Sequence, residues 1–365
     1  MKIERAIISG GGTGGHIFPA IAIADEIKRR NPDAQILFVG AEGKMEMEKV
    51  PEAGYDIRGL QIVGFKRKLA FSNFTLPFKI LKSLWNARKI LKEFKPQVAV
   101  GVGGYASGPT LKAATMLNIP SMVQEQNSFP GKTNKLLSKS VAKICVAYEG
   151  LERFFPKEKI ELTGNPTRKN MVDIKGKEKE GYEFYQLDPS QKTILIIGGS
   201  LGARTLNESV VNKLKELTES AVNVIWQCGK LYHTQLEEQL KGQDLGSVKM
   251  VQFIHRMDLA YSIADVVISR AGAISVSELC LVQKPTILVP SPNVSEDHQT
   301  KNAMALVSKN AALIIKDTEA KEKLIPKALD LIQDIATCKS LQENIKYLGK
   351  PNATMDIVNV IETIL

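Results

Sequence analysis

The chain has 365 residues, of which 44% are hydrophobic, and a formal net charge of +10. This length and composition fit two globular domains and exclude a disordered protein. The sequence contains no run of about 18 apolar residues, so we expect no membrane-spanning helix.

The cysteines and histidines show no metal-binding pattern. Four scattered cysteines without paired spacing predict reduced thiols of a cytosolic protein: Cys145, Cys228, Cys280 and Cys338. The four histidines do not have the spacing of a zinc site. The first residues run from a strand into a glycine loop, so we expect no export signal.

The first predicted unit is a strand, a glycine loop and a helix. A strand over residues 5–9 runs into the loop 10–16, and a helix with Pro19 near its start follows over 17–30. A strand over 35–39 completes a βαβ unit, which predicts a parallel, doubly wound sheet. The glycines allow a phosphate or a sugar to approach the backbone. No acid ends the second strand, so we do not expect NAD binding.

His16 stands where this loop becomes the helix. A histidine at a helix start is usually only a polar terminal residue. A loop so rich in glycine favours instead a base or hydrogen-bond donor that points into a cleft.

Residues 66–95 hold nine basic side chains and one acid, Glu93, and therefore eight of the net positive charges. Apolar residues recur there at helical spacing, which fits an amphipathic core helix with a solvated basic side. The one-sided charge favours a surface that meets an anionic membrane. No aromatic RNA-binding motif or zinc finger accompanies it, so we expect no nucleic acid. The predicted membrane patch comprises Phe74, Leu76, Lys79, Ile80, Lys82, Leu84, Trp85, Lys89 and Lys92.

Two further strands of the first half end in turns suited to a ligand. The strand over 97–102 leads into the glycine-rich turn 103–109, and the strand over 121–126 ends in the polar residues 125–127. A short strand over 143–146 follows, and the turn 163–168 marks a domain boundary. Residues 173–185 are charged and lysine-rich, and we predict a solvated connection there.

The second half repeats this pattern. A strand over 193–197 runs into the glycine turn 198–204 and a helix from residue 205. Another helix begins at residues 297–299. Further strands are predicted over 222–227, 248–253, 266–268 and 286–289.

Residues 266–280 combine a buried strand, a turn of small residues and the start of a helix. A ligand could lie against this turn at the positive end of the helix, with Glu278 accepting from a pair of sugar hydroxyls. The alternative is structural, because Ser275 and Glu278 have the spacing of a capping box.

Four turns of the second half could together hold a nucleotide, at residues 199–200, 254, 271–278 and 297–299. The first half offers its own turns at 10–16, 103–105 and 125–127. We therefore predict the α/β architecture called GT-B, in which two doubly wound, Rossmann-like domains with parallel sheets face each other across a cleft.

Seven motifs spread in order through the chain resemble those of the MurG family of glycosyltransferases. This family moves N-acetylglucosamine from UDP-N-acetylglucosamine onto lipid I and so makes lipid II for peptidoglycan. The family usually has histidine before its EQN triplet, where this chain has Gln124. The motifs are GGTGGH (11–16), GGYASGP (103–109), EQN (125–127), TGNPTR (163–168), GGSLGA (198–203), RAGAISVSE (270–278) and DHQTKNA (297–303).

The resemblance implies a role for each matching residue. His16 would be the catalytic base or would help to position it, and Tyr105 and Glu125 would lie on the acceptor side. Ile254 would line the uracil slot, and Glu278 would accept from the ribose. The other residues that bind the donor would be Thr13, Gly14, Gly15, Asn127, Arg168, Ser200, Ala273, Ile274, Ser275 and Gln299.

The implied reaction inverts the anomeric carbon. A base takes the proton of the acceptor 4-hydroxyl, while helix N-termini and Arg168 stabilise the departing UDP, so we expect neither a metal nor a cofactor. The resemblance also implies a peripheral protein at the cytoplasmic face of the inner membrane. It divides the chain into an acceptor- and membrane-facing domain (1–165), a UDP-sugar-binding domain (166–350) and a C-terminal helix (351–365) that crosses back to the first domain.

Other activities could use the same architecture, because a fold does not fix a reaction. A UDP-N-acetylglucosamine epimerase would form an epimer from the donor alone. A nucleotide-binding regulator would form no product.

Overall fold

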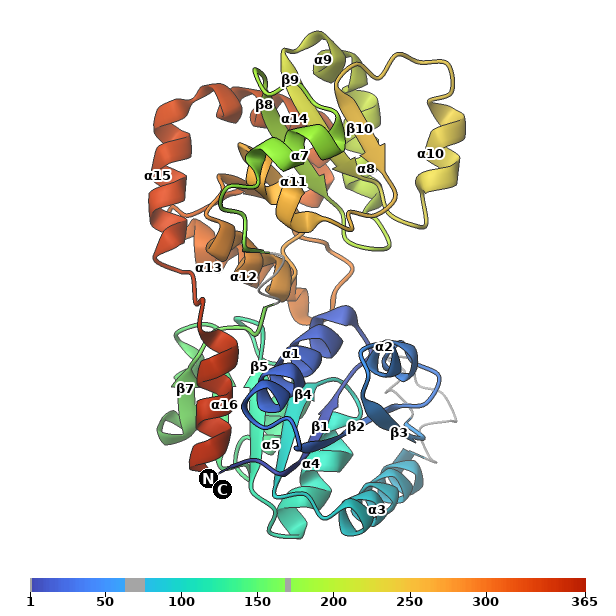
Figure 1. Cartoon of the computed structure of the whole chain (residues 1–365), viewed down its shortest axis with the longest axis vertical. Helices are drawn as coiled ribbons and strands as arrows, with labels where there is room; N and C mark the ends of the chain where they lie inside the picture. Colours follow the sequence, from blue (N-terminus) through green and yellow to red (C-terminus); the bar gives the residue numbers. More distant parts are fainter. Residues whose placement is uncertain (1, 63–75, 168–171) are drawn as a thin grey trace. The chain divides into compact units, whose positions relative to one another are not determined.

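The computed structural model describes residues 2–62, 76–167 and 172–365. The chain forms two compact units, Met1–Thr167 with Lys350–Leu365 and Arg168–Gly349 (Figure 1). Among the described residues, none of the helices has the length and apolar character needed to cross a membrane.

The first unit is built on a seven-stranded sheet with the order β3-β2-β1-β4-β5-β6-β7, and its paired neighbours are parallel. Its central strands are continuous buried runs, as expected for a sheet covered on both faces. The strands are β1 (Arg5–Gly10), β2 (Gln35–Ala41), β3 (Asp56–Leu60), β4 (Val98–Gly103), β5 (Ser121–Glu125), β6 (Lys143–Val146) and β7 (Ile160–Leu162).

Helices cover both faces of this sheet. On one face α1 and α16 pack over Ile8 and Val100, and on the other face α3 and α4 pack over Ile7 and Ala99. The helices are α1 (Gly14–Arg30), α2 (Glu46–Glu52), α3 (Leu76–Phe94), α4 (Ser107–Met116), α5 (Lys132–Leu137) and α16 (Ala353–Thr363), with short 3-10 turns η2 (Leu151–Arg153) and η3 (Lys157–Lys159).

The C-terminal helix α16 belongs to the first unit although the rest of the second unit precedes it in the chain. Its buried side chains join the core beside α1: Ile357, Val358 and Ile361. At the end of α1 the Arg30 guanidinium donates to the Asn359 Oδ1 at 2.8 Å and to the Met355 carbonyl at 2.9 Å. These bonds fix α16 along α1 (Figure 1).

The second unit contains a six-stranded parallel sheet with the order β10-β9-β8-β11-β12-β13. The strands are β8 (Lys192–Ile197), β9 (Val222–Gln227), β10 (Val248–Val251), β11 (Val266–Ser269), β12 (Thr286–Leu288) and β13 (Leu313–Ile314). The helices are α7 (Glu178–Tyr185), α8 (Arg204–Asn212), α9 (Leu214–Glu219), α10 (His233–Gln239), α11 (Met257–Ile263), α12 (Ala273–Val282), α13 (His298–Val307), α14 (Asp317–Gln333) and α15 (Ile335–Lys346), with the turn η4 (Ser295–Asp297).

Both sheets reverse their strand order at one place, between β1 and β4 in the first unit and between β8 and β11 in the second. Connections leave toward opposite faces on the two sides of such a point, so the carboxyl ends of the two strands leave a crevice that binds ligands in doubly wound folds. The predicted pair of doubly wound, parallel-sheet halves is confirmed.

The prediction of a solvated connection over residues 173–185 is wrong. Residues 178–185 form helix α7, and Gly181 and Tyr185 are buried on one of its faces. A Cβ atom at Gly181 would lie 2.7 Å from the Ile263 side chain, which shows how closely α7 approaches α11. The Lys177 ammonium also pairs with the Asp258 carboxylate at 3.0 Å. The lysine-rich composition did not indicate this helix, because its buried face consists of only Gly181 and Tyr185.

Candidate functional site

In the first unit the glycine turns after β1 and β4 touch each other. The Gly11 N–H donates to the Gly103 carbonyl at 3.3 Å. At Gly104 the backbone has φ +86°, and a Cβ atom there would lie 2.3 Å from the Gly11 carbonyl oxygen. Only glycine permits this approach, so the reversal point of the sheet is lined by bare backbone.

His16 lies over this contact. Helix α1 begins at Gly14, three residues earlier than predicted, so His16 occupies its first turn. The imidazole Nδ1 lies 3.0 Å from the Gly11 carbonyl oxygen, and a Cβ atom at Gly103 would lie 2.9 Å from Nε2. A carbonyl accepts only from a protonated nitrogen, so in the neutral ring Nδ1 carries the proton and Nε2 is the basic atom.

The other predicted residues of the first unit divide by burial. Thr13 and Gly15 are exposed at the start of α1, and Tyr105 is 58% exposed. Gly14 and Asn127 are partly exposed. These residues all follow the carboxyl ends of strands β1, β4 and β5.

Glu125 has a different setting from its neighbours. Its side chain is buried and accepts from the Asn127 and Gly131 backbone N–H groups at 3.0 and 3.1 Å and from the Asn134 amide at 2.8 Å. The carboxylate therefore organises the loop between β5 and α5. Gln124 is also buried, and its amide donates to the Asn165 Oδ1 at 2.9 Å, so this position belongs to the interior.

In the second unit a pocket of about 590 Å³ opens at the carboxyl edge of the sheet. It lies at the β8–β11 reversal point, where the turn after β8 and the turn after β11 meet. Its lining residues are Ile197, Gly198, Gly199, Gly202, Ala203, Arg204, Thr205, Tyr232, Ser269, Arg270, Gly272, Ser275, Ser291, Asn293, Gln299 and Asp317.

Two helices begin at this pocket. The N-cap positions of α8 and α12 are Ala203 and Gly272. Neither residue has a polar side chain that could cap the helix, and the partial positive charge of both N-termini faces the pocket. The capping-box interpretation of Ser275 and Glu278 is wrong, because α12 begins at Ala273 and includes Ser275 in its first turn. The arrangement suits a diphosphate.

Side chains from distant segments fix the turn before α12. The Gln299 Oε1 accepts from the backbone N–H of Ala271 at 3.2 Å and of Ser291 at 2.8 Å, so the Gln299 amide nitrogen is the group that can donate to a ligand. The Arg270 guanidinium bonds to the Asp317 carboxylate and donates to the Val289 carbonyl at 3.0 Å. Arg270 thus stabilises the pocket wall.

Sequence reasoning missed the buried Gln227 at the end of β9. Its amide nitrogen donates to the Gly199 carbonyl at 2.7 Å, and its Oε1 accepts from the Ile254 N–H at 3.1 Å. One side chain therefore joins the glycine turn to the predicted uracil slot. The glycine turn is also closely packed, since a Cβ atom at Gly202 would lie 2.1 Å from the Cys228 carbonyl oxygen.

The pocket brings together only part of the predicted donor site. Ser275 and Gln299 line it, as does Gly199 next to the exposed Ser200. Ile254 and Glu278 are buried outside its lining. Ala273 and Ile274 are partly exposed in the first turn of α12.

Burial and the Glu278 charge together raise the pKa of Tyr261 well above its usual value, with burial the larger cause.

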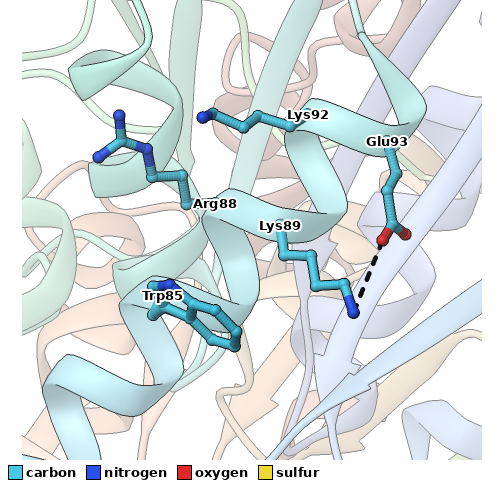
Figure 2. A pocket seen from close by; sticks show the side chains of 5 residues that line it. All are labelled: Trp85, Arg88, Lys89, Lys92 and Glu93. Atoms are coloured by element: carbon cyan, nitrogen blue, oxygen red, sulfur yellow. Dashed lines mark ion pairs between the residues drawn. The ribbon is translucent and has the colours of Figure 1, made fainter.

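Helix α3 presents an unusual outer face. Ser83, Ala87 and Leu91 are buried against the sheet, whereas Ile80 and Trp85 are 54% and 66% exposed. Figure 2 shows Trp85 and the basic side chains around an open pocket of about 430 Å³ that is lined by Trp85, Arg88, Lys89, Lys92 and Glu93.

One residue of the predicted membrane patch is wrong, and others of the patch and the donor site lie outside the described residues. Leu84 packs against the core with Ala87 and Leu91, so it is not part of the exposed patch. Lys82 is exposed and donates to the Gln61 Oε1 at 3.2 Å. Phe74 and Arg168 lie outside the described residues, as do the side chains of Leu76 and Lys79.

Comparisons with known proteins match both units to one family. The model of the glycosyltransferase family 28 N-terminal domain matches residues 6–146, and the model of the glycosyltransferase family 28 C-terminal domain matches residues 193–357.

Curated relatives extend the similarity over nearly the whole chain. A UDP-N-acetylglucosamine–N-acetylmuramyl-(pentapeptide) pyrophosphoryl-undecaprenol N-acetylglucosamine transferase from Bacteroides fragilis is 54% identical over 359 residues, which are 98% of this chain and 94% of that protein. The protein of the same name from Phocaeicola vulgatus is 57% identical over 358 residues, again 98% and 94% of the two chains.

Solved structures agree with this similarity. The crystal structure of Acinetobacter baumannii MurG has a TM-score of 0.79 and 30% identity, with 99% of both chains covered. A putative UDP-N-acetylglucosamine 2-epimerase from Listeria monocytogenes has a TM-score of 0.67 at 13% identity, with 100% of this chain and 97% of that chain covered. The latter likeness concerns the fold alone.

Proposed function

Because the chain belongs to glycosyltransferase family 28, we propose that it is an inverting transferase that moves N-acetylglucosamine from UDP-N-acetylglucosamine to the 4-hydroxyl of the muramyl sugar of lipid I, forming lipid II. The observation that carries this proposal is the pocket of the second unit, where two helix N-termini meet at the reversal point of a parallel sheet. Curated relatives that are 54% and 57% identical carry this activity in their names.

The second unit binds the donor. The diphosphate lies at the N-termini of α8 and α12, near Ser200 and residues 273–275, where backbone N–H groups and helix dipoles stabilise its charge. The Gln299 amide nitrogen donates to hydroxyls of the sugar. Ile254 lines the uracil slot, and Glu278 accepts from the ribose. Arg168 is also assigned to the diphosphate.

The first unit binds the acceptor and provides the base. The basic His16 Nε2 takes the proton of the acceptor 4-hydroxyl as that oxygen attacks the anomeric carbon, and the bond to UDP breaks. Thr13, Gly14, Gly15 and Asn127 approach the donor sugar. Tyr105, exposed in the turn after β4, contacts the acceptor, and Glu125 supports the adjoining loop.

The acceptor is attached to a lipid, so the enzyme must work at a membrane surface. The outer face of α3 combines the exposed Ile80, Leu81 and Trp85 with the exposed basic residues Arg88 and Lys92. Such a face suits the interface of an anionic bilayer. We assign the protein to the cytoplasmic face of the inner membrane as a peripheral protein, with no nucleic-acid partner.

The epimerase alternative has weaker support. It rests on folds that are 13% identical, whereas relatives named as transferases are more than 50% identical over nearly the full chain. An epimerase would also have no use for the apolar, basic face of α3.

Incubation with labelled UDP-N-acetylglucosamine and a lipid-diphosphate-linked muramyl acceptor tests the proposal. We expect label in a lipid product with inverted anomeric configuration, together with one UDP per transfer. Formation of a 2-epimer from the donor alone would support the alternative, and label in neither product would reject both activities.

A further inference from the structure

We propose that Glu46 is a positioning residue for His16 and acts through the peptide bond between Gly11 and Gly12. This inference rests on the proposed role of His16 as the base. Glu46 is the first residue of α2 and is only 1% exposed. No sequence motif singled it out, and it lies 34 residues from the glycine loop that it contacts.

The Glu46 carboxylate holds two backbone groups. Its Oε2 accepts from the Gly12 N–H at 2.8 Å, and its Oε1 accepts from the Ala41 N–H at 3.0 Å. Bonds from N–H groups to a buried carboxylate are stronger than those between neutral partners. The carboxylate therefore ties the glycine loop after β1 to the end of β2.

The same peptide unit contacts His16 on its other side. The Gly12 N–H donates to the Glu46 carboxylate, and the Gly11 carbonyl lies 3.0 Å from the His16 Nδ1. These two groups belong to the same peptide bond. A planar trans peptide points these two groups in opposite directions. A carboxylate, a peptide unit and an imidazole are thus connected in series, and each hydrogen bond of such a chain polarises the next.

The glycines keep this connection in place. A Cβ atom at Gly11 would lie 2.1 Å from the Glu46 Oε1, and one at Gly40 would lie 2.6 Å from its Cγ. Gly12 has φ +86°, a backbone conformation that side chains disfavour. Glycine is therefore needed at Gly11 and Gly40 partly because the Glu46 side chain occupies the space that a larger side chain would fill.

The function of the connection is to fix the ring of His16. With the Gly11 carbonyl held in one orientation, Nδ1 keeps its proton and Nε2 remains the basic atom. If the peptide turned, Nδ1 would lose this acceptor and keep its contact with the Thr13 Oγ1 at 3.4 Å. A hydroxyl can either donate or accept, so both tautomers would become populated. Glu46 would then affect the rate of proton transfer without touching either substrate.

The decisive variant is Glu46→Gln, which keeps the shape of the side chain but places an amide donor against one of the two backbone donors. We expect kcat to fall by about 10- to 100-fold through misplacement of the base. The KM for UDP-N-acetylglucosamine should change less than about threefold, because the change affects the chemical step and not ground-state binding. An unchanged kcat would overturn the proposal.

The matched control is Glu48→Gln, an exposed position on the same helix, for which we expect unchanged kinetics. A double-mutant cycle with His16→Ala separates positioning from general loss of structure. His16→Ala alone should lower kcat by roughly 10²- to 10⁴-fold. If Glu46 acts through His16, adding Glu46→Gln to His16→Ala should cause little further loss. Additive losses would show that Glu46 acts by another route.

A spectroscopic measurement tests the connection without turnover. In ¹⁵N-labelled protein the signals of His16, assigned by their loss in His16→Ala, should report the Nδ1-protonated tautomer. Glu46→Gln should move them toward a mixture of tautomers, and unchanged signals in a folded variant would contradict the inference. If His16→Ala retained full kcat while the signals still shifted, His16 would not be the base but the link between Glu46 and His16 would stand.

Discussion

At the scale of single residues, Gln227 has a position in the second unit like that of Glu46 in the first. Both side chains are buried, and both bond to backbone groups of a glycine turn. Gln227 is the last residue of β9, and Glu46 bonds to the last residue of β2. Gln227 joins the Gly199 carbonyl to the Ile254 N–H. A buried amide with two satisfied bonds fixes the relative positions of the two segments assigned to the nucleotide.

Replacement of Gln227 by leucine should weaken donor binding. The change leaves the buried Ile254 N–H without its partner, at about 1–3 kcal/mol, while the Gly199 carbonyl keeps only its bond from the Gly202 N–H. We expect the KM for UDP-N-acetylglucosamine to rise about tenfold or more, with a smaller change in kcat. Steady-state kinetics measures both. Gln235→Leu, at an exposed position of α10, is the control, and equal effects of the two variants would contradict the assignment.

The roles of Glu46 and Gln227 could not be predicted from the sequence. His16, Ser275 and Gln299 could be proposed because each stands at a glycine-rich or polar junction of a strand and a helix. Glu46 and Gln227 look like ordinary residues of a charged helix and an apolar strand. Their roles arise from partners about 30 residues away, at contacts that local spacing does not encode.

At the scale of secondary-structure elements, the end of α1 contains an ionic cluster around the buried Glu26 carboxylate. The Glu26 carboxylate bonds to the Arg29 and Arg30 guanidinium groups at 2.7 and 2.9 Å. The hydrogen bond from Arg29 is the largest cause that lowers the pKa of Glu26 to about 2, against the opposing effect of burial. Arg30 also bonds to α16, so the cluster links the two helices.

The lowered pKa makes the stabilising effect of Glu26 depend on pH. A carboxyl group whose pKa is lower in the folded state stabilises the protein above its unfolded pKa of about 4.5, and this effect is lost as the pH falls toward 2. Glu26→Gln should lower the free energy of unfolding by about 1–2 kcal/mol at pH 7, since Arg29 is largely exposed and screened. Urea titrations at pH 7, 5 and 3 should show the difference shrinking. A difference independent of pH would contradict this account.

The elements that could be predicted are those with a strong local signal. Buried β-branched runs before glycine turns predicted β1, β4, β8 and β11, and the structure has strands at all four places. Helix α7 was missed because its buried face consists of few residues within a lysine- and glutamate-rich segment. Leu84 was misassigned because helical spacing alone does not show which apolar residues face the sheet.

The outer face of α3 leads to a prediction about membrane binding. Each basic residue close to an anionic surface contributes about 1 kcal/mol, so changing Lys82, Lys89 and Lys92 to Glu should weaken binding to anionic vesicles on the order of 100-fold. Sedimentation with phosphatidylglycerol vesicles measures this. A control with the same change in net charge alters the exposed Lys179, Lys215 and Lys323 of the second unit. Equal losses in the two variants would show that only net charge matters.

At the scale of the whole molecule, the two units follow one plan. In each, the first strand lies at the point where strand order reverses. The glycine turns after β1 and β4 touch at that point in the first unit, whereas in the second unit the turn after β8 packs against the turn after β9. The surroundings differ, however. In the first unit the touching turns carry an imidazole, whereas in the second unit helices α8 and α12 begin at a pocket. The two units therefore have different proposed roles: the first unit supplies the base, and the second unit binds the nucleotide.

Hydrogen exchange of the intact chain with UDP alone tests this division. Backbone N–H groups that donate to a diphosphate exchange more slowly, because the bound ligand must leave before they open. We expect protection in the turns at residues 199–203 and 272–275, which line or adjoin the pocket of the second unit. The loop at residues 11–15 should exchange as before, since UDP lacks the sugar assigned to that loop. Gln227→Leu should reduce the protection at a fixed UDP concentration, because the turn at Gly199 would lose its support. If UDP protected the loop at 11–15 as strongly as the turns of the second unit, the nucleotide would also bind to the first unit. That result would contradict the assignment of nucleotide binding to the second unit.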